Sequence, residues 1–272
     1  MRYDRLVIDT HCHLDVAAFE ADREEVVARA TRAGVIGVLV PAIRPRTWGA
    51  LGALARQHAA VGVRCAIGIH PQIVHELEPD ERSGDLVRRI ADVATEAGAV
   101  AVGECGLDGA TAASAAEREV QATIFRAHLR AARELGKPVV IHVFRAHDAA
   151  PRILREERVH EVGGVLHSYS GGAALVPVYR DLGLAFSFAG PITYANARRP
   201  IEAARAIPAD LLLVETDAPD QAPAPHRGGR SEPAFLPAVI AGLATARATS
   251  AAEIAALTTA NARRLFGVPA WR

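Results

Sequence analysis

The segment "DTHCHLD" at residues 9–15 places two histidines and two carboxylates directly after the first apolar run of the chain. Side chains alternate between the two faces of a strand, so Asp9, His11 and His13 are expected on one face. Imidazoles and a carboxylate on one face are typical of a metal site, in which Asp9 would orient an imidazole. The alternative interpretation is a set of solvated polar residues where a strand enters a loop.

Other apolar runs also end in side chains that can bind a metal ion. These side chains are His70 in "GIHP", Glu104 in "GECGLD", His142 in "VVIHV", His167 in "LHSYS" and Asp217 in "ETDAP". If the runs are parallel strands, their ends meet at one edge, where so many polar groups would be costly to bury without a positive charge among them. The set exceeds the needs of one tetrahedral zinc, so it favours a two-metal site bridged by Glu104.

The apolar runs themselves predict the fold that positions these residues. Eight runs lie near residues 5–9, 34–43, 62–70, 99–104, 138–143, 163–168, 184–190 and 211–217. Helical patterns at 20–34 and 115–136 separate some of them and stop at glycines. Runs rich in Val, Ile and Leu indicate parallel strands that are buried on both faces. We therefore predict an α/β protein with a single (β/α)8 TIM-barrel domain over residues 1–272, because eight such units favour a closed barrel over an open doubly wound sheet. The absence of a G-x-G-x-x-G turn after the first run also weakens the dinucleotide-binding alternative.

Composition narrows the partners and the location. The chain has 272 residues, with 31 Lys and Arg against 31 Asp and Glu, so a polyanion would have to be held locally. Three cysteines without a C-x-x-C pair argue against a disulfide framework, and Cys12 and Cys105 are expected to pack outward in the core. No signal pattern or membrane-length apolar run is evident, so we expect a cytoplasmic protein with no membrane partner. The sequence gives no indication of the oligomeric state.

The motifs named above, together with "RGGRSEP" and "NARRLFG", are similar in order and type to those of the TatD-type metal-dependent hydrolases, a deoxyribonuclease-like branch of the amidohydrolase superfamily. This resemblance implies a divalent-metal centre formed by His11, His13, Glu104, His142, His167 and Asp217. It also implies that Asp217 deprotonates the attacking water. Many relatives in the larger superfamily bridge two metal ions with a carbamylated lysine. The one lysine here, Lys137, precedes the fifth strand and lies at its wrong end, so Glu104 would be the bridging ligand.

Residues outside the metal set are expected to hold the substrate or to support the ligands. The Pro- and Gly-rich loop at 219–233 follows the last strand and is expected to overhang the barrel mouth. Arg145, Arg227 and Arg230 are predicted to bind phosphate, while His70 and Glu232 are predicted to support the site or contact the substrate.

Two departures from the family pattern bear on the substrate. The chain continues "GLDGATA" where aromatic residues are common, so a stacking platform is missing there, and "HVFRAH" moves Arg145 one position later.

Three functions are consistent with the sequence. The first is a 3′-5′ phosphodiesterase acting on DNA ends, with two divalent ions (zinc, manganese or magnesium) and an activated water. The second is hydrolysis of an ester or amide, such as a D-aminoacyl-tRNA, and a small phosphodiester is a further anionic substrate. The third is a non-catalytic metal-binding barrel, which is disfavoured because all six ligand positions are filled.

Overall fold

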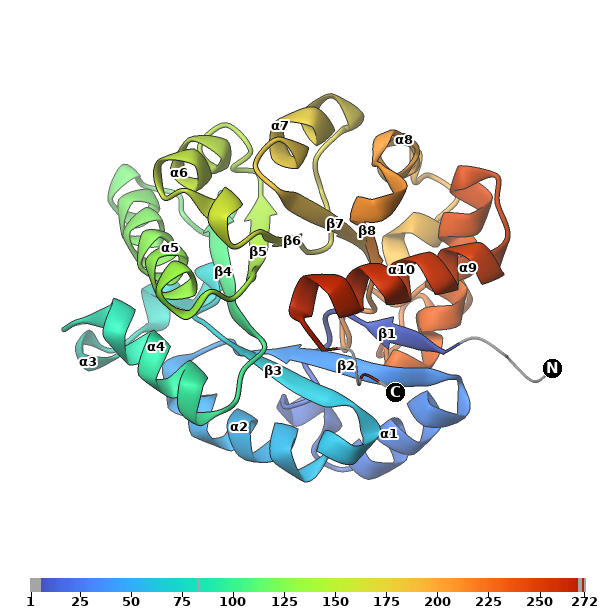
Figure 1. The fold of residues 1–272 in the computed structure, drawn as a ribbon, viewed down its shortest axis with the longest axis horizontal. Coiled ribbons are helices and arrows are strands. Elements are labelled where there is room, and N and C mark those ends of the chain that lie inside the picture. The colour runs from blue at the N-terminus through green and yellow to red at the C-terminus, as the bar shows by residue number, and fades with distance from the viewer. Residues whose placement is uncertain (1–5, 83, 269–270, 272) are drawn as a thin grey trace.

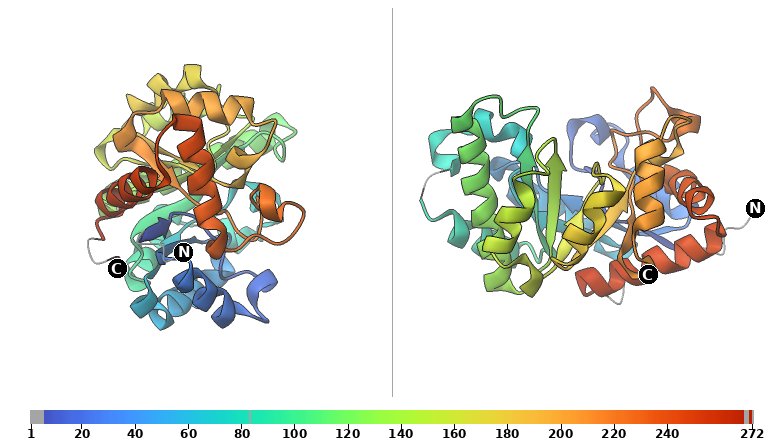
Figure 2. Two further views of the ribbon diagram at one scale, coloured as in Figure 1. Left: turned by 90° about the vertical axis from the view of Figure 1, so that its right-hand side faces the viewer. Right: turned by 90° about the horizontal axis from the view of Figure 1, so that it is seen from above.

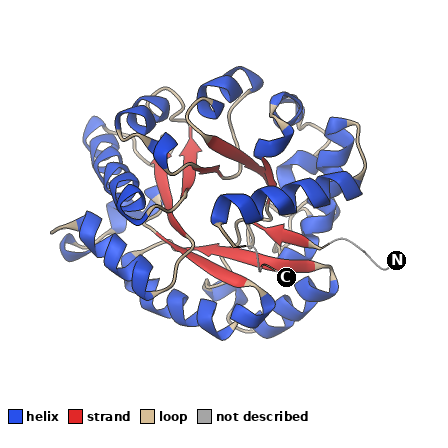
Figure 3. Ribbon diagram, in the orientation of Figure 1, coloured by secondary structure: helices blue, strands red, loops and turns tan. Residues whose placement is uncertain are grey.

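A computed structural model describes residues 6–82, 84–268 and 271, and its centre is an eight-stranded parallel sheet. Neighbouring strands pair in chain order, and helices surround them (Figures 1 and 3). The strands are β1 (Val7–Asp9), β2 (Val35–Pro41), β3 (Val63–Ile67), β4 (Ala101–Asp108), β5 (Val139–Phe144), β6 (Gly164–Leu166), β7 (Leu184–Phe188) and β8 (Leu212–Val214). This arrangement is the predicted (β/α)8 barrel, and every predicted strand is found.

The first and last strands approach each other along a seam that nearly closes the barrel. The amide of Thr10 donates to the carbonyl of Val214 at 3.2 Å, and the amide of Asp217 donates to the carbonyl of His11 at 2.9 Å. The amide of His13 then donates to the carbonyl of Ala218 at 2.8 Å. Main-chain hydrogen bonds across this seam therefore fix the "DTHCH" segment next to "ETDAP".

Helices cover the outside of the strands, as two further views show (Figure 2). They are α1 (Arg23–Arg32), α2 (Trp48–Gln57), α3 (Pro79–Arg82), α4 (Leu86–Glu96), α5 (Ala115–Leu135), α6 (Ala150–Glu156), α7 (Val176–Arg180), α8 (Arg198–Ala206), α9 (Leu236–Arg247) and α10 (Ala251–Phe266). The long α5 begins with a capping box between Ser114 and Glu117 and ends at Gly136, whose φ is +60°. The predicted helices at 20–34 and 115–136 therefore correspond to α1 and α5.

Two separate apolar layers hold the barrel together. One layer lies between strands and helices, and it includes the buried, free cysteines Cys12 and Cys105, which were expected to pack outward. The other fills the lumen with one residue from each strand: Ile8, Leu39, Ala66, Ala101, Val140, Val165, Ala185 and Leu213. Phe266 and Trp271 join this inner layer, and the indole of Trp271 donates to the carbonyl of Gly62 at 2.5 Å. Phe266 and Trp271 thus cover the end of the lumen where the strands begin.

Two sequence predictions of strand geometry need correction. β4 continues to Asp108 instead of ending near residue 104, because it pairs with β5 as far as Phe144. The strict alternation expected from Asp9 to His13 breaks at a bend at Thr10. Ile8 lies in the lumen layer, and the Thr10 hydroxyl lies 3.2 Å from that of Ser187. A same-face argument alone therefore does not explain how His11 reaches the site.

Among the described helices, none is by itself both long and apolar enough to cross a bilayer. Two successive segments, Pro233–Arg247 and Ala251–Phe266, reach that length and apolar content only when taken together, and the chain bends by 108° between them.

Candidate metal centre

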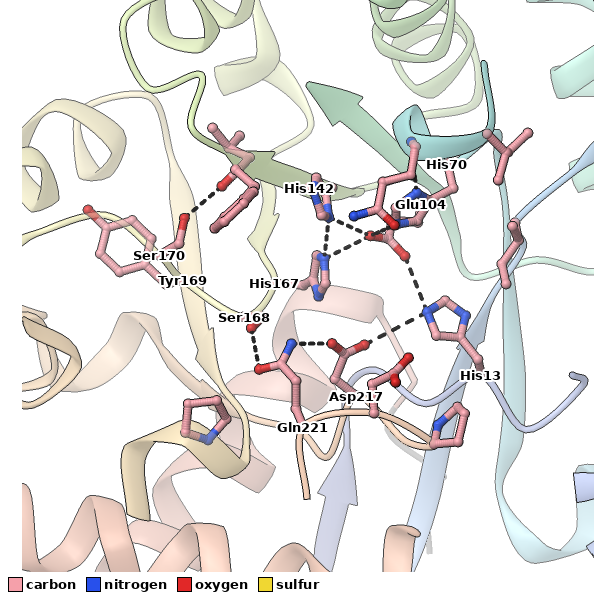
Figure 4. Close-up of a pocket in the computed structure, with 18 of the residues that line it drawn as sticks. His13, His70, Glu104, His142, His167, Ser168, Tyr169, Ser170, Asp217 and Gln221 are labelled. Atoms are coloured by element: carbon pink, nitrogen blue, oxygen red, sulfur yellow. Dashed lines mark hydrogen bonds and ion pairs between the residues drawn. The ribbon is translucent and has the colours of Figure 1, made fainter. Parts of the chain in front are cut away.

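The carboxylate of Glu104, on β4, is fully buried at the C-terminal ends of the strands and divides a cluster of histidines into two halves (Figure 4). Its Oε1 atom lies 2.9 Å from His70 Nε2, 3.1 Å from His142 Nδ1 and 2.7 Å from His167 Nε2. We call Glu104 Oε1 and these three histidines the supported half. Burial alone would raise the pKa of Glu104, but the surrounding imidazoles, His167 first among them, hold that pKa well below its ordinary value.

The other oxygen of Glu104, Oε2, faces the residues of the β1–β8 seam. It lies 3.1 Å from His11 Nε2 and 3.5 Å from His13 Nε2, and Asp217 Oδ1 lies 3.5 Å from the same atom of His11. We call Oε2 and these three residues the seam half. Burial, followed by the neighbouring His11, lowers the pKa of His13 to about 3, so its imidazole is neutral and its lone pair is available.

The donor atoms of the seam half fit a bound cation. Glu104 Oε2 is buried and forms no hydrogen bond of good geometry with any described residue. The Nε2 atoms of His11 and His13 lie only 3.2 Å apart and both face this oxygen. Lone pairs brought together without water are costly unless a positive charge lies among them. Two other sets of possible ligand atoms, one from His11, Glu104 and His167 and one from His70, Glu104 and His142, also lie within 4.8 Å of one another.

Two further carboxylates lie beside the imidazoles of the supported half, and Asp108 is within hydrogen-bond distance of its histidine, while Nδ1 of His167 has no hydrogen-bond partner in the described chain. Asp108 Oδ2, at the end of β4, lies 3.1 Å from His142 Nε2, which places the ring proton there and leaves Nδ1 to face the cluster. Glu215 Oε1 lies 3.5 Å from His167 Nδ1 and accepts the amide of Ser168 at 2.6 Å. Sequence reasoning missed Asp108 because it ended the strand four residues early.

His70 is held in a different way. Its Nδ1 accepts the amide of Gln72 at 3.1 Å, so the proton of the neutral ring lies on Nε2 and is donated to Glu104. The preceding amide of Ile69 donates to Nε2 of the buried His128, on α5, at 2.9 Å. A Cβ at Gly68 would come within 2.4 Å of the Gly103 carbonyl carbon, so glycine lets β3 approach β4 here. In this state His70 orients Glu104 and is not free to bind a cation through Nδ1.

Asp217 follows β8 in a left-handed conformation with φ of +52°, which turns its carboxylate into the mouth. One oxygen faces the seam histidines, and the other accepts the side-chain amide of Gln221. Burial raises the pKa of Asp217 to about 6, against the opposing charges of His11 and His167. A carboxylate with a pKa near neutrality is suited to accept a proton.

Asp9 supports the seam half through the main chain. Its Oδ1 accepts the amides of His11 at 3.2 Å and Thr216 at 3.0 Å, and its Oδ2 accepts the Thr216 hydroxyl at 2.5 Å. The expected contact with an imidazole is therefore replaced by contacts with two backbone amides. In the described chain, Nδ1 of His11 and Nδ1 of His13 have no hydrogen-bond partner.

A pocket of about 740 Å³ opens over the cluster. Its wall includes apolar residues of several strand ends together with Tyr169, Ser170, Gln221 and one arginine, Arg199. Arg199 lies near the start of α8 and is exposed. Sequence reasoning missed this arginine because a 3-10 turn, Gly190–Thr193, separates it from β7 and removes any strand register.

The arginines proposed from the sequence as phosphate contacts do not themselves form the wall of this pocket, although Arg145 lies beside Phe144, which does. Among the described residues, neither Arg145 nor Arg227 lines this pocket, and their guanidiniums lie 5.2 and 4.3 Å from the ring centroids of Phe144 and Tyr194. Glu232 is likewise absent from the pocket wall, because Arg29 binds its carboxylate at 2.7 Å. Arg230 pairs with Asp22 and also lies outside the wall. Of the loop at 219–233, Pro219, Asp220 and Gln221 line the pocket.

Comparison with known proteins gives consistent matches along almost the whole chain. The family model described as "TatD related DNase" matches residues 8–267. The chain is 33% identical to the uncharacterized metal-dependent hydrolase YabD of Bacillus subtilis over 97% of this chain and 100% of that protein. It is 35% identical to the 3′-5′ ssDNA/RNA exonuclease TatD of Erwinia amylovora over 96% of this chain and 100% of that protein. The crystal structure of YjjV, a TatD homolog from Escherichia coli, superimposes with a TM-score of 0.86 at 30% identity, covering 97% of this chain and 98% of that one.

Proposed function

Because this chain belongs to the TatD-related family of metal-dependent hydrolases, we propose that it is a phosphodiesterase that removes nucleotides from the 3′ ends of single-stranded nucleic acid. The observation that carries this proposal is the division of the cluster by Glu104, whose two oxygens face different sets of imidazoles. Such a carboxylate suits a pair of divalent ions. The 3′-5′ direction rests on the name of the Erwinia relative.

The residues that would hold the ions fall into the two halves. Glu104 would bridge them, His142 and His167 would hold one ion, and His11 and His13 would hold the other with Asp217 beside them. When bound, the ions would lower the pKa of a water molecule and neutralise charge that develops on a phosphate. Four imidazoles favour zinc or another late first-row metal, and manganese or magnesium are further possibilities for turnover on phosphates.

The protein's own groups complete the proposed reaction. Asp217 would accept the proton of the attacking water at the oxygen that faces His11. His70, which donates its Nε2 proton to Glu104, would keep that carboxylate in its bridging orientation. Arg199, in the pocket wall, would attract the anionic backbone of the substrate.

The test is a parallel assay of metal content and substrate range. Purified protein, loaded with zinc, manganese or magnesium, is incubated with 5′-labelled single-stranded DNA, single-stranded RNA and a D-aminoacyl-tRNA. We expect nucleotides to be released one at a time from the 3′ end, and Glu104→Gln to lose both the ions and more than about 100-fold in rate, since even residues behind metal ligands cost 10–100-fold. Hydrolysis of the aminoacyl ester alone, or full activity of Glu104→Gln, would overturn the proposal.

A further inference from the structure

Phe144 is an exposed aromatic side chain at the mouth of the barrel. Among the described residues, the large apolar side chains that are exposed are Leu6, Val61 and Phe144, at 57%, 40% and 38%. Leu6 and Val61 precede β1 and β3, at the end of the barrel where strands begin. Phe144 ends β5 at the opposite end and forms part of the pocket wall. A single exposed apolar residue needs no explanation, but an exposed ring in the wall of a pocket is in position to contact a bound ligand.

The backbone holds this ring in a fixed relation to the metal cluster. One face of β5 carries the side chains of Val140, His142 and Phe144, and Val140 belongs to the lumen layer. Phe144 therefore lies two residues, about 6–7 Å, beyond His142. Its register partner on β4 is Asp108, which orients His142. The amide of Gly109 donates to the Phe144 carbonyl at 2.8 Å and extends the pairing by one more hydrogen bond. The ring is therefore carried on strand structure one step outward from a predicted ligand.

A positive charge accompanies the ring. The guanidinium carbon of Arg145 lies 5.2 Å from the centroid of Phe144, within the range of a cation–π contact. Arg145 adopts a left-handed conformation, with φ of +51°, which is unusual for a residue other than glycine. An aromatic face next to a cation is the pair of features by which proteins hold single-stranded nucleic acid, because the ring stacks on a base and the cation attracts the backbone.

We propose that Phe144, with Arg145 beside it, stacks on the base of the nucleotide that adjoins the scissile phosphate. This inference rests on the proposed function and adds a specificity to it: the enzyme prefers a 3′-terminal nucleotide that carries a base over one that does not. Stacking on a ring tolerates all four bases, so the selection is for the presence of a base and not for its identity.

The test uses two single-stranded DNA oligonucleotides that differ only at the 3′-terminal nucleotide, which carries either adenine or an abasic tetrahydrofuran. Phe144→Ala and Phe144→Leu should lower kcat/KM on the adenine substrate by about 5- to 100-fold, mainly through KM, and leave the abasic substrate unchanged. Phe144→Trp should retain the wild-type preference. Val61→Ala, which removes an exposed apolar side chain at the far end of the barrel, is the matched control and should change neither substrate.

A binding measurement separates this inference from the proposed function. Calorimetry of the metal-loaded protein compares dAMP with 2-deoxyribose 5-phosphate, and wild type should bind dAMP more tightly while Phe144→Ala should bind both alike. If wild type cleaves neither oligonucleotide but shows this base-dependent binding, the proposed function fails and the stacking site stands. Equal binding of the two compounds by wild type, or equal losses on both oligonucleotides in Phe144→Ala, would overturn the stacking site.

Discussion

The two halves of the cluster share Glu104 but are held in place by different means. In the supported half, a carboxylate fixes the far ring nitrogen of His142 and a backbone amide fixes that of His70, while the far nitrogen of His167 has only a 3.5 Å approach from Glu215 and no hydrogen bond. In the seam half, the far nitrogens of His11 and His13 have no partner among the described residues. Their positions depend on main-chain hydrogen bonds between the first and last strands. Since side-chain partners fix the tautomer and orientation of a ligand, we expect the supported half to bind its ion more tightly.

The largest expected effect belongs to Asp217 in the seam half. Asp217→Asn keeps an oxygen near His11 but cannot accept a proton, so kcat should fall by about 10²–10⁴-fold. Metal content should fall less than it does in Glu104→Gln, which alters a group shared by both halves. The check is kcat together with metal content by elemental analysis. A variant that retains its metal and more than about a tenth of wild-type kcat would show that proton transfer runs through another group.

The supported half is linked to α5 by the hydrogen bond from Ile69 to the neutral His128. We expect the free energy of unfolding to fall in acid because of this buried histidine. Burial lowers the pKa of His128 to about 4, from 6.5 in an unfolded chain. Between these two values the unfolded chain binds a proton that the folded protein does not, so stability falls as the pH drops from about 6.5 to 4, by about 3 kcal/mol for a group this well buried.

This acid sensitivity can be isolated by substitution. His128→Gln, whose amide can supply the same acceptor to Ile69 and donor to Ile124, should remove that part of the pH dependence. The measurement is the free energy of unfolding by denaturant at pH 4.5 and 7 for both proteins. Parallel pH profiles for wild type and variant would show that His128 does not contribute to the acid sensitivity.

Asp108 tests the comparison between the halves directly. Asp108→Asn weakens the hydrogen bond to His142 Nε2. It should lower the affinity for the ion of the supported half by about 10–100-fold and have little effect on the ion of the seam half. Asp92→Asn, on an exposed part of α4, is a matched loss of charge that should leave both affinities unchanged. Metal titration followed by calorimetry resolves the two binding steps. Equal loss at both steps would show that the halves do not act separately.

The smallest expected effect lies in the outer wall of the pocket. Arg199→Ala should raise KM for a nucleic-acid substrate by about 10-fold, as expected for one lost contact with a charged group, without changing metal content. Arg227→Ala, whose guanidinium lies over Tyr194 and outside the pocket wall, serves as the comparison and should resemble wild type. If Arg227→Ala has the larger effect on KM, the assignment of the anion contact returns to the loop at 219–233.

The apolar runs predicted the barrel and the convergence of the strand ends, because buried parallel strands leave a continuous apolar signal and end at one edge. The pattern of runs has a limit. It could not predict features that depend on departures from regular structure. The bend at Thr10 changes the direction in which the His11 side chain points. The extension of β4 to Asp108 depends on its pairing with β5.

The residues of the pocket wall were harder to predict for the same reason. Arg199 follows a 3-10 turn, where no register relates sequence position to direction. The aromatic ring that the sequence lacks after Asp108 is supplied by its register partner Phe144 on the next strand. The motif resemblance to the TatD-type hydrolases, in contrast, is confirmed along the chain by the family match over residues 8–267.

The most direct test of the two halves is the anomalous scattering of manganese in crystals of the protein. We predict two peaks about 3.5–4 Å apart, one on each side of the Glu104 carboxylate. One peak should lie next to His142 and His167, and the other next to His11 and His13. At limiting manganese, the peak beside His142 should appear first. A single peak, or peaks that do not contact Glu104, would contradict the account.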